Sequence, residues 1–406
     1  MTTDADVIIA GAGPAGSLAA YELASRGVST LILEKSSFPR YKVCGAGLTY
    51  KILREIPFDV SSVFETEIRT IIFSSRFSEV FTRTSAEPML FCTNRDKFDD
   101  FLLQKAVEAG AKVIHGAKVM EVSQKPDFVN VVTRDRTFRA RLVIGAEGAS
   151  GAVARSAGLR TNILQGLAWE AEVMADPKIV KAFSQKVFLD WGTFPGGYGW
   201  VFPKGDHFSI GVGGPASLSK WMIPYYDRLL TYLETEFGIK VVETISLKSW
   251  PIPVRVKESV FHNGRVLVAG DAAGLTDPLT GEGIYYAVRS GILAAKSCHA
   301  YLTGVNTSLD SYTLAVNEEL MQELLAANRI KDLFNTFPMR IHHFIRDNDR
   351  AWRAFVMILR GERWYADVPK GFGKWKRFWP PACTISRWIS KIREQLFLKA
   401  GFRKGG

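Results

Sequence analysis

Cysteine is scarce in this chain, and the few cysteines are not spaced for metal or disulfide chemistry. They lie far apart in 406 residues, and no C-x-x-C pair occurs. Zinc sites and disulfide frameworks need closely spaced or regularly paired cysteines, so we expect neither a metal site nor a disulfide scaffold. Reduced thiols suit a cytoplasmic protein. The four cysteines are Cys44, Cys92, Cys298 and Cys383.

Long apolar runs and a leader are also missing. No run of apolar residues approaches the ~18 that a membrane-spanning helix needs. The first residues lack the basic and apolar regions of a secretory signal and lead almost directly into the apolar stretch Val7–Ala10, so we expect no cleaved leader. The sequence contains no internal repeat and no low-complexity segment, and its length favours two domains.

Positive charge is distributed unevenly. Residues 339–406 hold 16 Lys and Arg against 5 Asp and Glu, whereas the preceding residues hold 36 of each, so this segment carries the whole net charge of +11. It also holds five of the ten tryptophans. Cations mixed with aromatic residues suit a membrane interface, but they also suit nucleic-acid phosphates or a solvated helical cap. Composition alone leaves these three alternatives open.

The stretch Asp6–Lys35 has the order strand, glycine-rich turn, helix, strand and acid that is typical of a dinucleotide-binding unit. Gly11 permits a tight turn, Gly13 permits close approach to a pyrophosphate, and Gly16 permits close packing of helix and strand. The helix N-terminus then faces the phosphates, and the carboxylate of Glu34 suits a ribose. The motif indicates a dinucleotide without naming it. Pro14, Ala15 and Lys35 complete the predicted contacts of this unit.

Two later segments are predicted to meet the same ligand. Arg95 begins a predicted helix and has a guanidinium that suits a phosphate. Asp271 lies in Val268–Ala273, where a strand ends and a helical turn begins, so its carboxylate suits a ribose or ribityl hydroxyl. Asp271 could also simply cap the turn, and the two roles do not exclude each other, because capping and ligand binding use the same geometry.

The remaining pattern predicts an α/β fold, α+β overall, in which a Rossmann-type domain is interleaved with an antiparallel sheet. Residues 1–65, 93–160 and 260–303 are expected to form the dinucleotide-binding domain, and residues 66–92 and 161–259 the sheet domain. Residues 304–406 are expected to form a helical region. The main predicted elements are helices at 17–26, 93–109, 151–157, 218–237 and 282–302, a β-meander at 112–141, and strands at 29–33 and 142–150.

At these residues the sequence resembles the geranylgeranyl reductase family of the FAD-dependent monooxygenase-like superfamily. The resemblance covers Asp6 to about Leu302. Besides the glycine motif and Arg95, it rests on Phe38–Leu48, on the pair Glu147–Gly148 and on Gly270–Ile284. Its most specific part is P-x-x-Y-x-W-x-F-P, present as Pro195, Tyr198, Trp200, Phe202 and Pro203. The superfamily more often has Asp before Gly148, so a direct cofactor contact by Glu147 is less well supported.

The resemblance implies a reaction and its cofactors. Members of this family use reduced FAD to saturate carbon–carbon double bonds of a polyprenyl chain, with NAD(P)H or a ferredoxin-type protein as electron donor. The substrate would be a prenyl lipid, a chlorophyll side chain or a quinone, and the proton would come from a nearby acid. A flavin-dependent hydroxylase and a non-catalytic prenyl-lipid binding protein remain alternatives. A halogenase is disfavoured because its W-x-W-x-I-P motif lacks the first Trp here, where Tyr198 stands.

The resemblance also implies the site residues. Tyr198, Trp200 and Phe202 alternate along a predicted strand and would form one wall of an apolar channel, although such stripes usually pack in a core. Cys44 follows two cations and is either a proton donor near the flavin or a small packing residue. Cys44, Tyr198 and Trp200 are thus the predicted catalytic residues, and Pro278 joins the aromatic residues in contacting substrate. The resemblance adds eight residues to the predicted FAD contacts: Arg40, Cys44, Gly45, Gly148, Gly270, Gly281, Gly283 and Ile284.

A prenyl substrate that resides in the bilayer decides between the three interpretations of the basic C-terminal segment. Membrane-surface association then becomes the favoured interpretation, the helical cap the second, and we expect no nucleic acid. We therefore expect a cytoplasmic protein that associates peripherally with membranes and accepts electrons from NAD(P)H or a ferredoxin-type protein.

Overall fold

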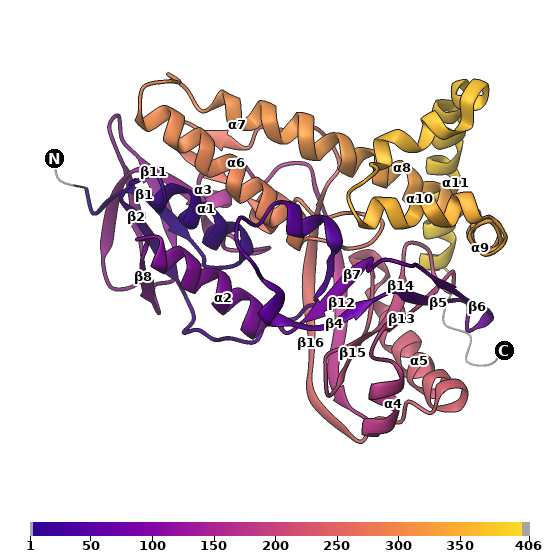
Figure 1. The fold of residues 1–406 in the computed structure, drawn as a ribbon. Coiled ribbons are helices and arrows are strands. Elements are labelled where there is room, and N and C mark those ends of the chain that lie inside the picture. The colour runs from indigo at the N-terminus through magenta and orange to yellow at the C-terminus, as the bar shows by residue number, and fades with distance from the viewer. Residues whose placement is uncertain (1–2, 400–406) are drawn as a thin grey trace.

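Two large β-sheets and a helical C-terminal region make up the fold (Figure 1). The computed structural model describes residues 3–399, apart from the side chains of residues 372–378. The first sheet has the order β17-β18-β11-β1-β2-β8, and β10 and β9 extend from β11. Its strands are β1 (Ala5–Ala10), β2 (Thr30–Glu34), β8 (Lys112–His115), β9 (Glu121–Gln124), β10 (Val129–Val132), β11 (Thr137–Gly145), β17 (His262–Asn263) and β18 (Val266–Val268).

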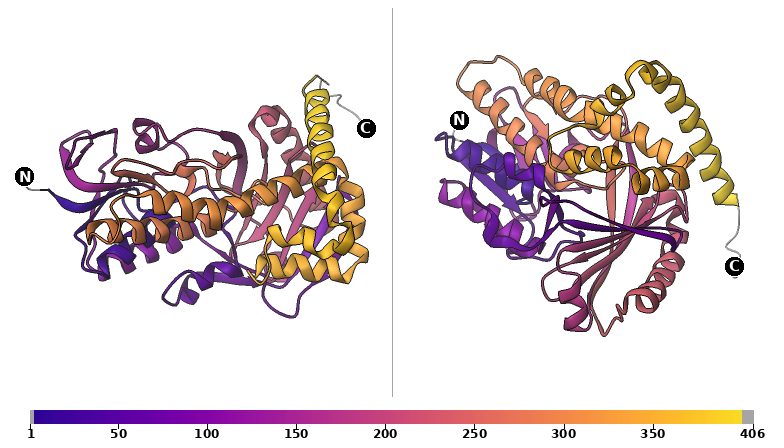
Figure 2. Two further views of the ribbon diagram at one scale, coloured as in Figure 1. Left: turned by 90° about the horizontal axis from the view of Figure 1, so that it is seen from above. Right: turned by 45° about the vertical axis from the view of Figure 1, so that its right-hand side comes forward.

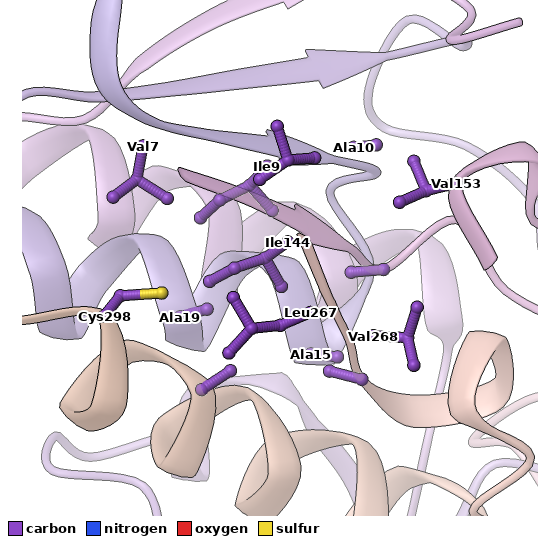
Figure 3. Close-up of a cluster of buried hydrophobic side chains, with 14 of the residues drawn as sticks. Val7, Ile9, Ala10, Ala15, Ala19, Ile144, Val153, Leu267, Val268 and Cys298 are labelled. Atoms are coloured by element: carbon purple, nitrogen blue, oxygen red, sulfur yellow. The ribbon is translucent and has the colours of Figure 1, made fainter. Parts of the chain in front are cut away.

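The central strands of this sheet are parallel and buried on both faces. Val7, Ile8 and Ile9 are fully buried, which explains why the strand reads as a continuous apolar run. Helices α1 (Pro14–Ala24) and α6 (Ile284–Leu302) pack together on one side (Figure 3). A Cβ at Gly291 would lie 2.2 Å from the carbonyl oxygen of Ala15, so the contact requires glycine.

The second sheet has seven strands in the order β16-β12-β15-β14-β13-β5-β6. Neighbouring strands are antiparallel, as predicted, except that β13 and β5 are parallel. Helix α5 (Met222–Phe237) and the short α4 (Pro177–Ala182) cover one face (Figure 1). The strands are β5 (Thr70–Ser75), β6 (Ser78–Thr84), β12 (Ile163–Met174), β13 (Lys186–Trp191), β14 (Tyr198–Pro203), β15 (Phe208–Pro215) and β16 (Glu243–Arg255).

The opposite face of the second sheet is covered by the C-terminal helices (Figure 2). Trp352 and Ile345 pack there against Phe73 and Trp191, so this part of the chain belongs to the core and is not a solvated cap. The elements are α7 (Asp310–Ala315), the π-helical η5 (Val316–Met321), α8 (Gln322–Thr336), α9 (Pro338–Asp347), α10 (Asp349–Leu359), η6 (Tyr365–Phe378) and α11 (Trp379–Lys399).

A small sheet in the order β3-β7-β4 and several short helices connect these parts. The predicted α/β fold, with a Rossmann-type sheet and a helical C-terminal region, is confirmed. Within the described residues, no helix is both long and apolar enough to span a bilayer. The remaining elements are β3 (Gly47–Thr49), β4 (Phe64–Ile68), β7 (Leu90–Thr93), α2 (Arg95–Glu108), α3 (Ala152–Ser156), η1 (Tyr50–Arg54), η2 (Ser61–Val63), η3 (Ala216–Trp221) and η4 (Gly270–Ala273).

Several predicted helix boundaries were off, and the structure explains three of them. Helix α1 begins at Pro14 instead of Ser17, because proline at the first helical position needs no hydrogen-bond acceptor for its missing N–H. The helix predicted from 218 is divided, since Leu218 lies in η3 and has non-helical dihedral angles. Helix α6 begins at Ile284, two residues later than predicted, because Glu282 is held in the preceding loop by Lys51.

Candidate active site and cofactor cleft

One cavity of about 1830 Å³ extends from the glycine motif to the C-terminal helices. Gly11 and Glu34 line one end, and Phe355 and Ile358 of α10 line the other. Pockets for small ligands are commonly about 300–1,000 Å³, so this cavity has room for a dinucleotide and for a second, elongated molecule.

The glycine motif forms the turn that the sequence predicted. Gly11 has φ +97°, and a Cβ there would lie 2.6 Å from the carbonyl oxygen of Ala146. A Cβ at Gly16 would lie 1.9 Å from the carbonyl oxygen of Gly11, so helix α1 approaches β1 only because residue 16 is glycine. Glu34 is buried and accepts hydrogen bonds from the N–H groups of Ala12 (2.8 Å) and Ser36 (2.9 Å). The carboxylate therefore holds the turn and still has lone pairs for a ribose.

Two guanidinium groups form an anion site beside this turn. Asp99 is fully buried and accepts two hydrogen bonds from Arg95 at 2.7 Å, while Arg40 approaches it at 3.0 Å. Arg40 Nη1 is buried without a hydrogen-bond partner among the described residues, and Arg40 Nη2 would lie 3.9 Å from a Cβ on Gly13. An unpaired guanidinium nitrogen beside the glycine turn fits a pyrophosphate. Arg40 is thus better placed than Arg95, whose guanidinium is already paired.

The loop between η4 and α6 closes the cavity near its middle. Asp277 Oδ1 accepts hydrogen bonds from the N–H groups of Leu279 (2.7 Å) and Thr280 (3.2 Å), which fixes the loop. Lys51 Nζ lies 2.7 Å from Glu282 Oε2, and both side chains are largely buried. Sequence reasoning missed Lys51 and Asp277. Only the acid beside a Pro-Leu-Thr-Gly turn gave a signal for Asp277, and Lys51 is 231 residues from its partner.

The three aromatic residues of β14 share one face, as predicted, and line the cavity. Trp200 lies flat over β15, because a Cβ at its cross-strand neighbour Gly211 would be 2.3 Å from the indole ring. Phe202 packs against the loop that follows Arg40, where a Cβ at Gly45 would lie 3.1 Å from its ring. The Tyr198 hydroxyl donates to the carbonyl oxygen of Thr280. Tyr198 therefore holds the loop before α6, and Trp200 and Phe202 hold the loop around Gly45.

Cys44 lies half-buried in the cavity wall. The N–H of Ala46 donates to its sulfur at 3.3 Å, and the guanidinium of Arg95 lies within hydrogen-bonding reach. Burial and the charge of Arg95 lower the pKa of the neighbouring Lys42 to about 8. The thiol thus borders two cationic groups, and its role as proton donor or positioning group stays a prediction.

Beyond Tyr198 the cavity becomes an apolar channel between the second sheet and the C-terminal helices. Phe73, Leu189 and Trp191 line it from the sheet. The aromatic wall on β14 was expected, but this extension of the channel was not predicted, because its residues have the pattern of ordinary core packing. The helices contribute Phe334, Ile341, Ile345, Phe355 and Ile358.

The cavity brings together almost all of the predicted site residues, although their individual roles stay predictions. Gly16 lies beneath the turn and does not line the cavity. Glu147 accepts hydrogen bonds from the N–H groups of Ala152 and Val153 and so caps α3. The predicted residues that line the cavity are Gly11, Gly13, Pro14, Ala15, Glu34, Lys35, Arg40, Cys44, Gly45, Arg95, Gly148, Tyr198, Trp200, Phe202, Gly270, Asp271, Pro278, Gly281, Gly283 and Ile284.

Comparisons with known proteins agree with this arrangement. Residues 4–322 match the family described as FAD binding domain. An uncharacterized protein of Methanosarcina barkeri is 37% identical over 295 residues, covering 72% of this chain and 73% of its own. A geranylgeranyl diphosphate reductase of Rhodobacter capsulatus is 32% identical over 309 residues, covering 73% of this chain and 75% of its own. A digeranylgeranylglycerophospholipid reductase of Methanocaldococcus jannaschii is 29% identical over 301 residues, covering 72% of this chain and 76% of its own.

Among solved structures, a geranylgeranyl bacteriochlorophyll reductase-like protein of Thermoplasma acidophilum superposes with a TM-score of 0.71 at 26% identity, covering 82% of this chain and 87% of its own. The flavin-dependent brominase Bmp2 superposes with a TM-score of 0.74 at 22% identity, covering 95% of this chain and 99% of its own. At that identity the second likeness concerns the fold alone.

Proposed function

The chain belongs to the FAD-binding domain family and, within it, to the geranylgeranyl reductases, and from this premise we propose that it saturates double bonds of a polyprenyl chain held in its apolar channel. As a member of that family it is an FAD-dependent oxidoreductase. One observation supports the proposed substrate class above the others: a single cavity joins the anion site beside the glycine motif to a channel walled by aromatic and aliphatic side chains.

The residues at each end of the cavity suit the two ligands. Bound FAD supplies a hydride equivalent when reduced. Arg40 and the N-terminus of α1 would hold its pyrophosphate, Glu34 a ribose, and the loop between η4 and α6 would border its ring. Trp200 and Phe202 would align the flexible chain, and the apolar channel would exclude water from the reacting bond.

The proposal is tested by reducing the FAD-loaded protein without oxygen and adding a geranylgeranyl lipid, followed by mass spectrometry. We expect the product to gain two hydrogen atoms for each saturated bond. A product that gains an oxygen atom, and only in air, would instead identify a hydroxylase on the same scaffold. An unchanged lipid with bound FAD would identify a non-catalytic lipid-binding protein. Anaerobic titration with NADPH, NADH and reduced ferredoxin then distinguishes the proposed electron donors.

We also propose that the protein is cytoplasmic and that α11 places it on a membrane surface. The face of α11 that packs inward holds the small residues Cys383, Ser386 and Ser390, whereas Ile385 is 58% exposed and Trp388 is 66% exposed. A helix that buries serine and exposes tryptophan has the reverse of ordinary surface patterning, which suits an interfacial helix. Arg387 and Lys391 are exposed on the same helix and would attract anionic headgroups.

The double substitution Ile385→Ser and Trp388→Ser should weaken binding to anionic phospholipid vesicles at least tenfold, because each apolar side chain contributes about 1.5–3 kcal/mol on burial. Vesicle sedimentation at low and high salt measures the change. Deleting the helices would not test the idea, since α9 and α10 belong to the core.

The matched control is Val242→Ser with Val305→Ser, because these two side chains are 74% and 77% exposed and lie outside α11. Equal vesicle binding by the two double variants would exclude α11 as the membrane contact.

A further inference from the structure

A buried acid faces the cavity and has no part in the functions described above. Glu170 of β12 is fully buried and lines the cavity. Its Oε1 accepts a hydrogen bond from Ser209 Oγ at 2.8 Å, and its Oε2 has no hydrogen-bond partner among the described residues. Buried polar atoms are nearly always paired, so an unpaired carboxyl oxygen in a cavity wall points to a ligand or a reacting group.

The position of Glu170 in the second sheet puts it in line with the aromatic wall. Glu170 pairs across the sheet with Gly211, and Gly211 pairs on its other side with Trp200. The same row continues through Leu189 to Phe73, which line the apolar channel. Residues directly opposite one another on adjacent strands point to the same face, so Glu170 lies on the face of the second sheet that lines the apolar channel.

Small residues keep the space above this acid open. Along β12, Gly166 and Ala168 precede Glu170 on the same face and also line the cavity. Gly211 has no side chain, and the Trp200 ring lies over it, with Nε1 at 3.4 Å from Ser209 Oγ. A chain that passes over Trp200 would therefore come within reach of Glu170 Oε2.

The charged groups around Glu170 set its ionisation. Burial and the negative charge of Glu172 raise the pKa of Glu170 to about 7, and the opposing effects of Lys204, Ser209 and Lys42 are weaker. The charge of Glu170 also acts on two tyrosines, which stay uncharged at neutral pH, and burial raises the pKa of both further. They are Tyr41, in the loop after Arg40, and Tyr226, on α5.

A group of polar residues connects this part of the sheet to solvent. Glu172 Oε1 lies 3.5 Å from Lys204 Nζ, and Glu172 Oε2 lies 3.2 Å from His207 Nε2. His207 Nδ1 lies 2.7 Å from Asp206 Oδ1, and the Asp206 side chain is 83% exposed. Burial opposes ionisation of Glu172, but the contacts with His207 and Lys204 outweigh it and lower its pKa. The two acids of β12 thus differ: the inner one keeps its proton up to about pH 7, whereas the outer one is ionised well below that pH.

We propose that Glu170 is the acid that gives the proton when a double bond of the bound chain is saturated. The inference rests on the proposed function and adds the proton donor to it. One alkene carbon accepts a hydride from the reduced cofactor, and the alkene electron pair forms the second C–H bond with the proton of Glu170. The hydride brings both electrons from the reduced cofactor, the carboxylic acid becomes a carboxylate, and a proton from solvent restores Glu170 before the next turnover.

The experiment compares the protein with Glu170→Gln, Ser209→Ala and Cys44→Ser, all loaded with FAD. Infrared titration follows the carbonyl band of protonated carboxylic acids without any substrate, and anaerobic single-turnover reduction of a geranylgeranyl lipid gives the rate against pH. Glu243→Gln is the control, because it removes an exposed carboxylate from the neighbouring strand β16.

We expect the rate of the unaltered protein to fall as pH rises through about 7, because only the protonated acid gives a proton. Glu170→Gln should remove one infrared band, retain FAD and lower the rate by about 10²–10⁴-fold without that pH dependence. Ser209→Ala should move the pH dependence upward, because it removes a hydrogen bond that favours the carboxylate. A merely structural role for Glu170 predicts no such movement.

Three results would overturn the inference: an infrared band that titrates far below neutral pH, an unchanged rate profile in Glu170→Gln, or loss of the pH dependence only in Cys44→Ser. If the unaltered protein reduces no prenyl lipid, the proposed function fails, and the infrared titration still reports whether Glu170 is protonated.

Discussion

Replacing Asp99 by asparagine should lower the free energy of unfolding of the FAD-free protein by about 3–5 kcal/mol. Asp99 is fully buried and holds the guanidinium groups of Arg95 and Arg40. Asparagine keeps the shape but removes the only negative charge that either guanidinium contacts within 4 Å among the described residues, so two buried cations would repel each other. Removing one partner of a buried ion pair costs more than the pair contributes, because a charge is left unpaired.

The loss should be smaller when FAD is bound, because a pyrophosphate would supply negative charge to the same two guanidinium groups. Urea unfolding followed by tryptophan fluorescence measures both forms, and the midpoint of the FAD-free variant should fall by about 1 M or more. Asp96→Asn is the control, since Asp96 is exposed in the same turn of α2 and accepts only the N–H of Lys97. A variant as stable as this control would show that Asp99 does not hold the anion site together.

Replacing Ala354 by tryptophan should nearly abolish prenyl reduction and leave FAD binding unchanged. Ala354 lies on the face of α10 that lines the channel, far along the cavity from Gly11 and Glu34. A tryptophan there would fill space that the proposed substrate needs, and displacement of a reacting bond by even about 1 Å can cost a hundredfold in rate. We therefore expect kcat/KM for a geranylgeranyl lipid to fall at least about 100-fold.

Met357→Trp is the matched control for this substitution, because Met357 lies on the same helix but is 37% exposed and does not line the cavity. Chemical reduction of the flavin should proceed equally in both variants. Normal turnover by Ala354→Trp would place the substrate outside the channel and would leave the cavity without its proposed occupant.

The cofactor end of the cavity was predictable because its signals are local in sequence. Gly11, Gly13 and Gly16 stand close together in sequence, and the structure confirms that Gly11 and Gly16 are required by close backbone approaches. The alternation of Tyr198, Trp200 and Phe202 likewise predicted a shared face, since alternation is a property of a single strand.

The rest of the cavity was not predictable, because it is assembled from distant segments. The channel joins β5 and β13 to α8, α9 and α10, and each of these elements alone has an ordinary apolar pattern. The sequence analysis did not single out Glu170, because only the pairing of β12 with β15 brings it opposite Gly211. The C-terminal tryptophans also act differently from one another: Trp352 is 6% exposed in the core, whereas Trp388 is 66% exposed on α11. The division into domains stays a prediction.

The channel wall formed by α9 and α10 lies beyond residue 322, where the match to the FAD-binding family ends. Under the proposed function, the stretch that holds the cofactor and the stretch that closes over the substrate are therefore separate parts of the chain. This part of the wall can therefore be altered without touching the residues that line the cofactor end of the cavity. If the proposed function holds, exchanging the segment after residue 322 with that of a relative should change which prenyl chains are accepted and leave FAD binding intact.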